Sequence, residues 1–238
     1  IISAIIFLAL PIVISYFVNY IYLLGDTYFI SLINPHSSAP LSGTGLLYPL
    51  ELSFEAIAAG LATGLSAITG RLLGEGKVEK CKSLGANGLF LGLVISIPVL
   101  IVCYACGPQI INFLSGSNLS AEASKYALEY LYGIAPGIVF MVLSQIIGGV
   151  LVGQGLASVT TKGFMIMTIL NFALDPIFMF VCKLGVFGAG LGTSVSLFFS
   201  LVYVSVYAIK GKSSISINFK LSYIDKSVIY QILYIGLP

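Results

Sequence analysis

Long apolar runs, separated by short polar and turn-forming segments, dominate the pattern of this 238-residue chain. A helix needs roughly 20 mostly apolar residues to cross the hydrocarbon core of a bilayer. Turn chemistry separates six such runs, for example "NPHSSAP" after the first and "GRLLGEGKVEKCK" after the second. We therefore predict six transmembrane helices, over residues 4–33, 42–70, 83–107, 122–149, 158–182 and 186–209.

A polar stretch follows the sixth run and precedes another apolar one. Residues 210–228 include "KGKSSISINFKLSYIDKS", which is typical of a linker at the membrane surface. The last run, "VIYQILYIGLP", is the expected start of a seventh helix. We accordingly expect a six-helix transmembrane lobe over 1–209, a cytoplasmic linker over 210–228, and the beginning of a seventh helix over 229–238. The chain then reads as a piece of a longer protein.

Composition places the chain in the same class. Hydrophobic residues make up 58% of it and charged residues 8%, whereas a soluble domain is about a quarter charged. We therefore predict an all-α, polytopic membrane protein. The net charge of +2 is small and dispersed, so it gives no indication of nucleic-acid binding. Nine of the eleven lysine and arginine residues follow the second, fourth and sixth helices, so we expect those connections and the N-terminus to be cytoplasmic.

Four acidic residues lie inside the predicted helices with no cation beside them in sequence: Asp26, Glu51, Glu55 and Asp175. A charge at the bilayer centre costs about 2.5–3.5 kcal/mol on insertion scales. A bound cation or a proton must therefore neutralise each of them. Such residues mark ion paths or proton relays by default.

Asn171 and Asp175, in "NFALDP", are the most informative pair. Their spacing puts both on one helix face, one turn apart. Pro176 cannot donate a backbone hydrogen bond to the carbonyl of Phe172, so we expect a kink that exposes a further oxygen. Oxygen ligands of this kind suit a hard cation such as sodium, or a proton on the carboxylate. The alternative is a pair that only hydrogen-bonds neighbouring helices.

Glu51 and Glu55 also lie one turn apart, where like charges repel. At least one of them is expected to be protonated or to lie at the wet end of a cavity, so both are candidates for lining it. The alternative places Glu51 at the outer interface, exposed to water, which makes Glu55 the more informative of the two.

Three segments resemble the multidrug and toxic compound extrusion (MATE) transporters. They are "GDTYFIS" on the first helix, "GLATGLSAITGRLLGEGKVEKCKSLG" over the second helix and its following loop, and "NFALDPIFMFVCKLGVFGAGLGTSVS" over the fifth and sixth helices. "YIGLP" is similar to the start of the family's seventh helix. The resemblance implies the N-terminal six-helix lobe of a twelve-helix transporter in the plasma or inner membrane.

The resemblance also implies a function. The family exports organic cations and other amphipathic compounds by antiport against sodium ions or protons, and its members are not enzymes. Members with a cation site in this lobe have residues that match Asp26, Asn171, Asp175 and Thr193, so these four are the expected sodium or proton site. Asn19, seven residues before Asp26, is a further candidate for lining the cavity. The implied partners are small substrates, the bilayer and the C-terminal lobe of the same protein; no cofactor beyond the coupling ion is expected.

Two other functions stay open. A lipid-linked saccharide flippase of the same superfamily shares the fold, but usually carries cationic residues in its central cavity, whereas the in-span residues here are acidic. An intramembrane enzyme is the alternative from another class, since two aspartates can do acid–base chemistry. No nucleophile or metal-binding set accompanies them in the sequence.

Overall fold

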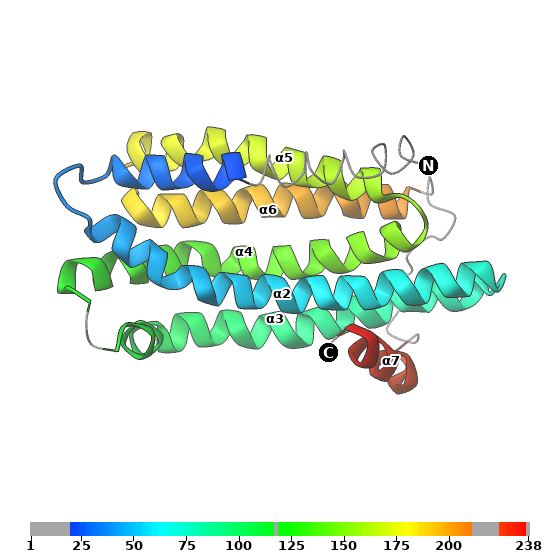
Figure 1. Ribbon diagram of the computed structural model, residues 1–238. Helices are drawn as coiled ribbons and strands as arrows, with labels where there is room; N and C mark the ends of the chain where they lie inside the picture. Colours follow the sequence, from blue (N-terminus) through cyan, green and yellow to red (C-terminus); the bar gives the residue numbers. More distant parts are fainter. Residues whose placement is uncertain (1–19, 117–118, 211–223, 237–238) are drawn as a thin grey trace, which may run out of the picture.

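The computed structural model describes residues 20–116, 119–210 and 224–236, which form an elongated helical bundle (Figure 1). Every regular element within them is a helix. A helical segment over 20–31 comes first. It is followed by α2 (Ala39–Gly74), α3 (Val78–Ser115), α4 (Ala121–Gly153), α5 (Ala157–Pro176), the π-helical η1 (Ile177–Val181), α6 (Gly185–Ile209) and the short α7 (Lys226–Gly236).

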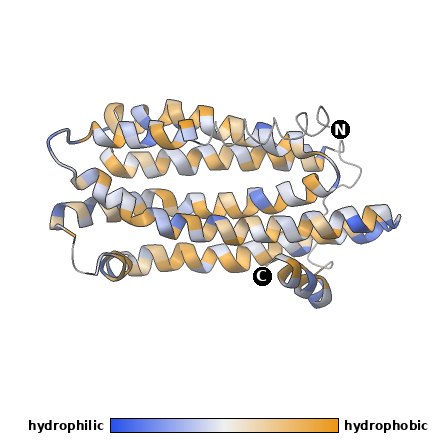
Figure 2. Ribbon diagram, viewed as in Figure 1, coloured by the Kyte–Doolittle hydropathy of each residue, from blue (hydrophilic) through white to orange (hydrophobic). Residues whose placement is uncertain are grey.

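Five stretches among the described residues are long and apolar enough to cross a membrane: α2, α3, α4, α5 with η1, and α6. Segment 20–31 is the end of the first predicted span, whose earlier residues lie outside the described part. Large apolar side chains face outward, with Phe113, Ile169 and Val181 exposing 85%, 69% and 75% of their surface. Figure 2 shows apolar residues along all these helices. Such a surface suits lipid, and the all-α multi-pass fold agrees with the prediction.

The third predicted span ends at a break inside α3. It was predicted to end at residue 107, and the backbone leaves helical geometry at Cys106 (φ −122°, ψ 19°). A second helical stretch then continues to Ser115, with Pro108 in its first turn, where the missing N–H of proline is tolerated. The predicted boundary therefore coincides with the kink, and the helical residues beyond it were not predicted.

α4 is the central helix, packed against α2, α3, α5 and α6. Two glycines show how closely its neighbours approach. A Cβ atom on Gly133 would lie 2.5 Å from the carbonyl oxygen of Phe187 in α6, and one on Gly149 would collide with the carbonyl of Ala62 in α2. Small residues give membrane helices this close packing, because lipid supplies no hydrophobic drive between them.

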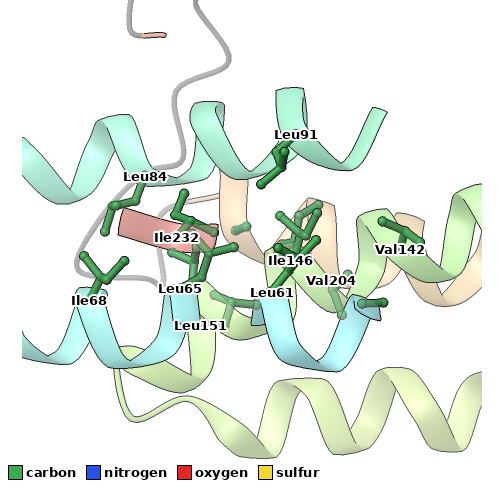
Figure 3. Packing of buried hydrophobic residues seen from close by; sticks show 14 of the residues in the cluster. Leu61, Leu65, Ile68, Leu84, Leu91, Val142, Ile146, Leu151, Val204 and Ile232 are labelled. Atoms are coloured by element: carbon green, nitrogen blue, oxygen red, sulfur yellow. The ribbon is translucent and has the colours of Figure 1, made fainter. Parts of the chain in front are cut away.

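Buried apolar side chains join the helices in two clusters. The cluster in Figure 3 links α2, α3, α4, α6 and α7, and includes Leu65, Leu84, Ile146, Val204 and Ile232. The second links segment 20–31 with α2, α3, α4 and α6, through residues such as Ile30, Leu47, Cys103, Leu131 and Val186.

α7 starts inside the predicted linker, at Lys226, and packs on the lobe. The backbone N–H of Asp225 donates to Oδ1 of the buried Asn87, 2.8 Å away, and the Ile232 side chain is fully buried. Residues 211–223 of the predicted linker and 237–238 of the predicted seventh helix lie outside the described residues.

Candidate functional site

One face of α5 turns toward the bundle and becomes polar along its length. Apart from Thr168, its buried residues recur every four positions: Val159, Gly163, Met167, Asn171 and Asp175. Residues at this spacing share a helix face. The first three pack against neighbours, and the last two carry an amide and a carboxyl group into the interior together, as the spacing predicts.

Asn171 joins α5 to α6. Its Nδ2 donates to Asp175 Oδ1 and to Thr193 Oγ1, at 3.0 Å each. Thr193 Oγ1 donates in turn to the carbonyl of Ala189, 3.2 Å away on its own helix. Gly192 leaves room for this arrangement, since a Cβ atom there would collide with Asp175 Oδ1.

Asp26 enters from segment 20–31. The ring of Phe29 lies 5.4 Å, centroid to centroid, from the ring of Phe172, which holds the segment against α5. The carboxyl group of Asp26 lies within hydrogen-bonding range of that of Asp175. The structure thus brings together all four residues of the expected site, the fourth being Thr193.

Two facing carboxyl groups without a counter-charge define the electrostatics of this site. Asp26 exposes 8% of its surface and Asp175 none. Asp26 Oδ1 and Asp175 Oδ2 are both buried without a hydrogen-bond partner. Every described lysine and arginine lies in a connection or within two turns of a helix end. A buried, unpaired charge is costly and like charges repel, so the pair requires a proton or a cation.

The donor set indicates which positive species fits. Two carboxyl groups, an amide and a hydroxyl offer hard oxygen atoms, which suit sodium or a proton and not a transition metal. Among the described residues, no three His, Cys, Asp or Glu side chains are grouped to hold a metal ion.

Two tyrosines extend the site, and neither was predicted from the sequence. Tyr22 is within hydrogen-bonding range of Thr193. It stands one turn before Asp26, a spacing that was visible in the sequence. Tyr130 of α4, only 4% exposed, is within hydrogen-bonding range of the Glu51 carboxyl group. Nothing in the apolar sequence around it pointed to that contact.

Of the two glutamates, Glu51 lies beside the site. It is half-buried, next to Tyr130 and within electrostatic reach of Asp26. Glu55, which the sequence favoured, has an exposed side chain. The register of α2 explains the difference, because Leu47, Glu51 and the buried Ala58 share the face turned to the bundle. Asn19 lies outside the described residues.

A family model described as MatE matches residues 11–177, more than half of the chain, including Asp26, Asn171 and Asp175. The chain belongs to the MatE family. The multidrug export protein MepA of Staphylococcus aureus strain NCTC 8325 is 26% identical over 231 residues, covering 97% of this chain and 50% of MepA. MepA of Staphylococcus saprophyticus is 25% identical over 233 residues, with the same coverage of each chain.

Solved structures agree with this assignment. A MATE transporter in the bent conformation superposes with a TM-score of 0.87 at 26% identity, covering 99% of this chain and 51% of that one. A MOP superfamily transporter from Pyrococcus furiosus has a TM-score of 0.83 at 27% identity, with the same two coverages. Reverse polarity of its binding pocket suggests a different function for that transporter.

MatE membership bears on the earlier expectations. It confirms the resemblance and places the chain among membrane transporters, so the intramembrane enzyme is no longer a candidate. The chain spans about half the length of the curated relatives it matches.

Proposed function

We propose that the chain forms the N-terminal lobe of a cation-coupled antiporter, which exports organic cations and other amphipathic drugs by alternating access. Sodium ions or protons would drive the export. The observation that carries this proposal is the buried Asp26–Asp175 pair, which has two unpartnered oxygens. The described lysine and arginine residues all lie in connections or near helix ends. The similarity to multidrug export protein MepA supports the choice of substrate class.

The geometry supports a simple coupling step. An incoming ion binds between Asp26 Oδ1 and Asp175 Oδ2, the two oxygens that lack partners. One positive charge leaves a single negative charge in the site, and the Asn171 amide stabilises it through its hydrogen bond to Asp175. The repulsion between segment 20–31 and α5 is thereby removed. Ion release restores the repulsion and favours the other conformation.

The size of this coupling is limited by how differently the two conformations bind the ion. A ligand shifts a conformational equilibrium only by the difference between its affinities for the two states. The Asp26–Asp175 pair supplies this difference, because its two carboxyl groups belong to separate helices. If those helices move apart, two oxygens can no longer share one ion. The state with the carboxyl groups together binds the ion, and the state with them apart releases it.

The arrangement of the connections supports an orientation. Figure 1 shows the α2–α3 and α4–α5 connections and the end of α6 at one end of the bundle, and the other connections at the opposite end. The first end carries most of the basic residues, whereas the opposite end has Lys125 and Lys183. We infer that the first end is cytoplasmic, and the N-terminus with it.

The flippase alternative has less support. Binding the phosphate of a lipid-linked saccharide calls for cationic side chains in the central cavity. Away from the helix ends, the charged side chains of the described spans are acidic, and Asp26, Glu51 and Asp175 lie together. The site therefore favours a positively charged ligand.

The test uses the complete transporter in proteoliposomes, with efflux of a fluorescent organic cation as the measurement. Sodium and proton gradients are imposed separately. We expect one gradient to drive export, and Asp26→Asn or Asp175→Asn to abolish it while the protein still folds. Glu55→Gln is the matched control, because it neutralises an exposed carboxyl group. Full gradient-driven export in both aspartate variants, or no response to either gradient in the wild type, would refute the proposal.

A further inference from the structure

α4 has a break in its backbone hydrogen bonding at Pro136. Proline has no N–H, so the carbonyl of Tyr132 loses its partner within the helix. The hydroxyl group of Tyr104 in α3 donates to that carbonyl instead, at 2.8 Å. The two tyrosine rings stack with centroids 5.4 Å apart. A side chain from a neighbouring helix therefore satisfies the break.

Ser194 of α6 contacts the next pair of backbone groups along α4, those of Gly133 and Gly137. Its Oγ donates to the carbonyl of Gly133 at 2.7 Å and accepts from the N–H of Gly137 at 2.9 Å. In an undisturbed α-helix, these two backbone groups would bond to each other. The Ser194 hydroxyl group thus bridges a backbone acceptor and a backbone donor of α4. Insertion of a side chain between such groups is a recognised cause of helix bending.

This contact differs from those of two other buried serines. Ser96 and Ser196 donate to carbonyls four residues earlier in their own helices. That arrangement is common for serine within helices. Ser194 is equally buried, but both of its hydrogen bonds cross to α4. The lack of a side chain at Gly137 makes this possible, since a Cβ atom there would lie 2.8 Å from Ser194 Oγ.

Ser194 also adjoins the candidate ion site. The preceding residue, Thr193, accepts the hydrogen bond from Asn171. Any displacement of the α6 backbone at Thr193 moves Ser194 with it, because the two are covalent neighbours. A continuous chain of bonded groups thus joins Asp175, through Asn171, to the break in α4.

We propose that Ser194 is a positioning residue, which couples occupancy of the ion site to bending of α4 at Pro136. This inference rests on the proposed function. The Gly137 N–H has two discrete partners available, Ser194 Oγ and the Gly133 carbonyl. Displacement of α6 on ion binding exchanges one for the other, which straightens or bends α4. Coupling between sites requires such an element with two arrangements, whose equilibrium both sites bias.

The experiment measures hydrogen exchange by mass spectrometry on the complete transporter in lipid nanodiscs, with and without the driving ion. Two regions are followed: residues 168–176 of α5, which report on the site, and 133–141 of α4, which report on the break. We expect both to respond to the ion in the wild type. In Ser194→Ala, α5 keeps its response and α4 loses most of it.

Transport provides a second measurement. We expect Ser194→Ala to lower turnover roughly two- to tenfold, at an unchanged ion concentration for half-maximal rate. The variant loses both hydrogen bonds of Ser194, but the Gly137 N–H can then bond to the Gly133 carbonyl, so the net loss is one neutral hydrogen bond. Ser196→Ala is the matched control, since it removes a buried hydroxyl group from the same helix without touching α4. If Ser194→Ala does not fold, Ser194→Cys keeps a side chain of similar shape with weaker hydrogen bonding, and α4 is expected to lose part of its response.

The outcomes separate the two proposals. A wild type in which neither region responds to sodium or protons contradicts the proposed function. A Ser194 variant whose α4 response and turnover both match the wild type, while α5 responds normally, overturns the role of Ser194 and leaves the ion site standing.

Discussion

The Asp175→Asn substitution tests the electrostatic account most directly, because it changes charge and almost nothing in shape. Asp175 is completely buried and faces Asp26. In the variant, the side-chain carbonyl still accepts from Asn171, and the new amide can donate to Asp26, whose Oδ1 has no partner in the wild type. No hydrogen bond needs to be lost, so we expect the variant to fold.

The expected gain in stability follows from Coulomb's law. Two unit charges about 4 Å apart repel by about 4 kcal/mol at an effective dielectric constant near 20. Asp175→Asn removes this repulsion from the ion-free state, in which neither sodium nor a proton is bound and both carboxyl groups are charged. We therefore expect the ion-free variant to be about 2–4 kcal/mol more stable to unfolding than the ion-free wild type, since relaxation of the site relieves part of the full value. The wild type should gain a similar amount from the ion, about 2.7 kcal/mol at 100 times its dissociation constant.

The assay is thermal unfolding of the purified transporter across a range of sodium concentration and pH. We expect the midpoint of the wild type to rise with the driving ion. The midpoint of Asp175→Asn should start high and stay constant, while gradient-driven export is lost. Glu55→Gln should behave like the wild type. If the variant melts at or below the ion-free wild type and still gains stability from the ion, the two carboxyl groups do not share a charge and the reasoning fails.

Three further substitutions test the surroundings of the site. Glu51→Gln should change the ion concentration for half-maximal transport roughly two- to tenfold, equivalent to about 0.5–1.4 kcal/mol. Glu55→Gln should leave this concentration unchanged. Equal effects of the two variants in an ion titration would contradict the placement of Glu51. Asn171→Ala removes a hydrogen bond to a charged group, worth about 1.5–3 kcal/mol, so the same titration should shift about tenfold or more; an unchanged midpoint would show that the amide does not hold the carboxylate. Gly133→Ala forces α6 away from α4, because the added Cβ atom lies 2.5 Å from the Phe187 carbonyl oxygen. In thermal unfolding, we expect this variant to be about 1–3 kcal/mol less stable than the wild type. Its unfolding midpoint should still rise with the driving ion as in the wild type.

Much of this fold could be predicted because a bilayer imposes simple rules on sequence. Runs of about 20 apolar residues and the turn chemistry between them located α2, α4, α5 and α6. Local chemistry fixes one helix start, where Ser120, the N-cap of α4, accepts from the N–H of Ala123 at 3.1 Å. The face shared by Asn171 and Asp175 followed from helical spacing alone.

Contacts between helices were harder to predict, since they depend on how each helix is rotated. Glu51 and Glu55 are equivalent in the sequence, and only the register of α2 turns Glu51 to the site. The position of Ser194 opposite the break in α4 depends on the close packing of two helices.

The pattern of hydrogen bonds argues against a purely structural role for the acidic pair. A structural Asp–Asn pair inside a membrane would be expected to satisfy every buried oxygen, because an unsatisfied one costs about 1–3 kcal/mol. Here Asn171 donates to one oxygen of Asp175, while the other, and one oxygen of Asp26, have no donor; the two facing carboxyl groups can bond to each other only by sharing a proton. An asparagine at either position would complete the network more cheaply. Two buried carboxyl groups therefore lower the stability of the ion-free lobe. Ion binding offsets this cost in one half of a transport cycle, and ion release restores it in the other half.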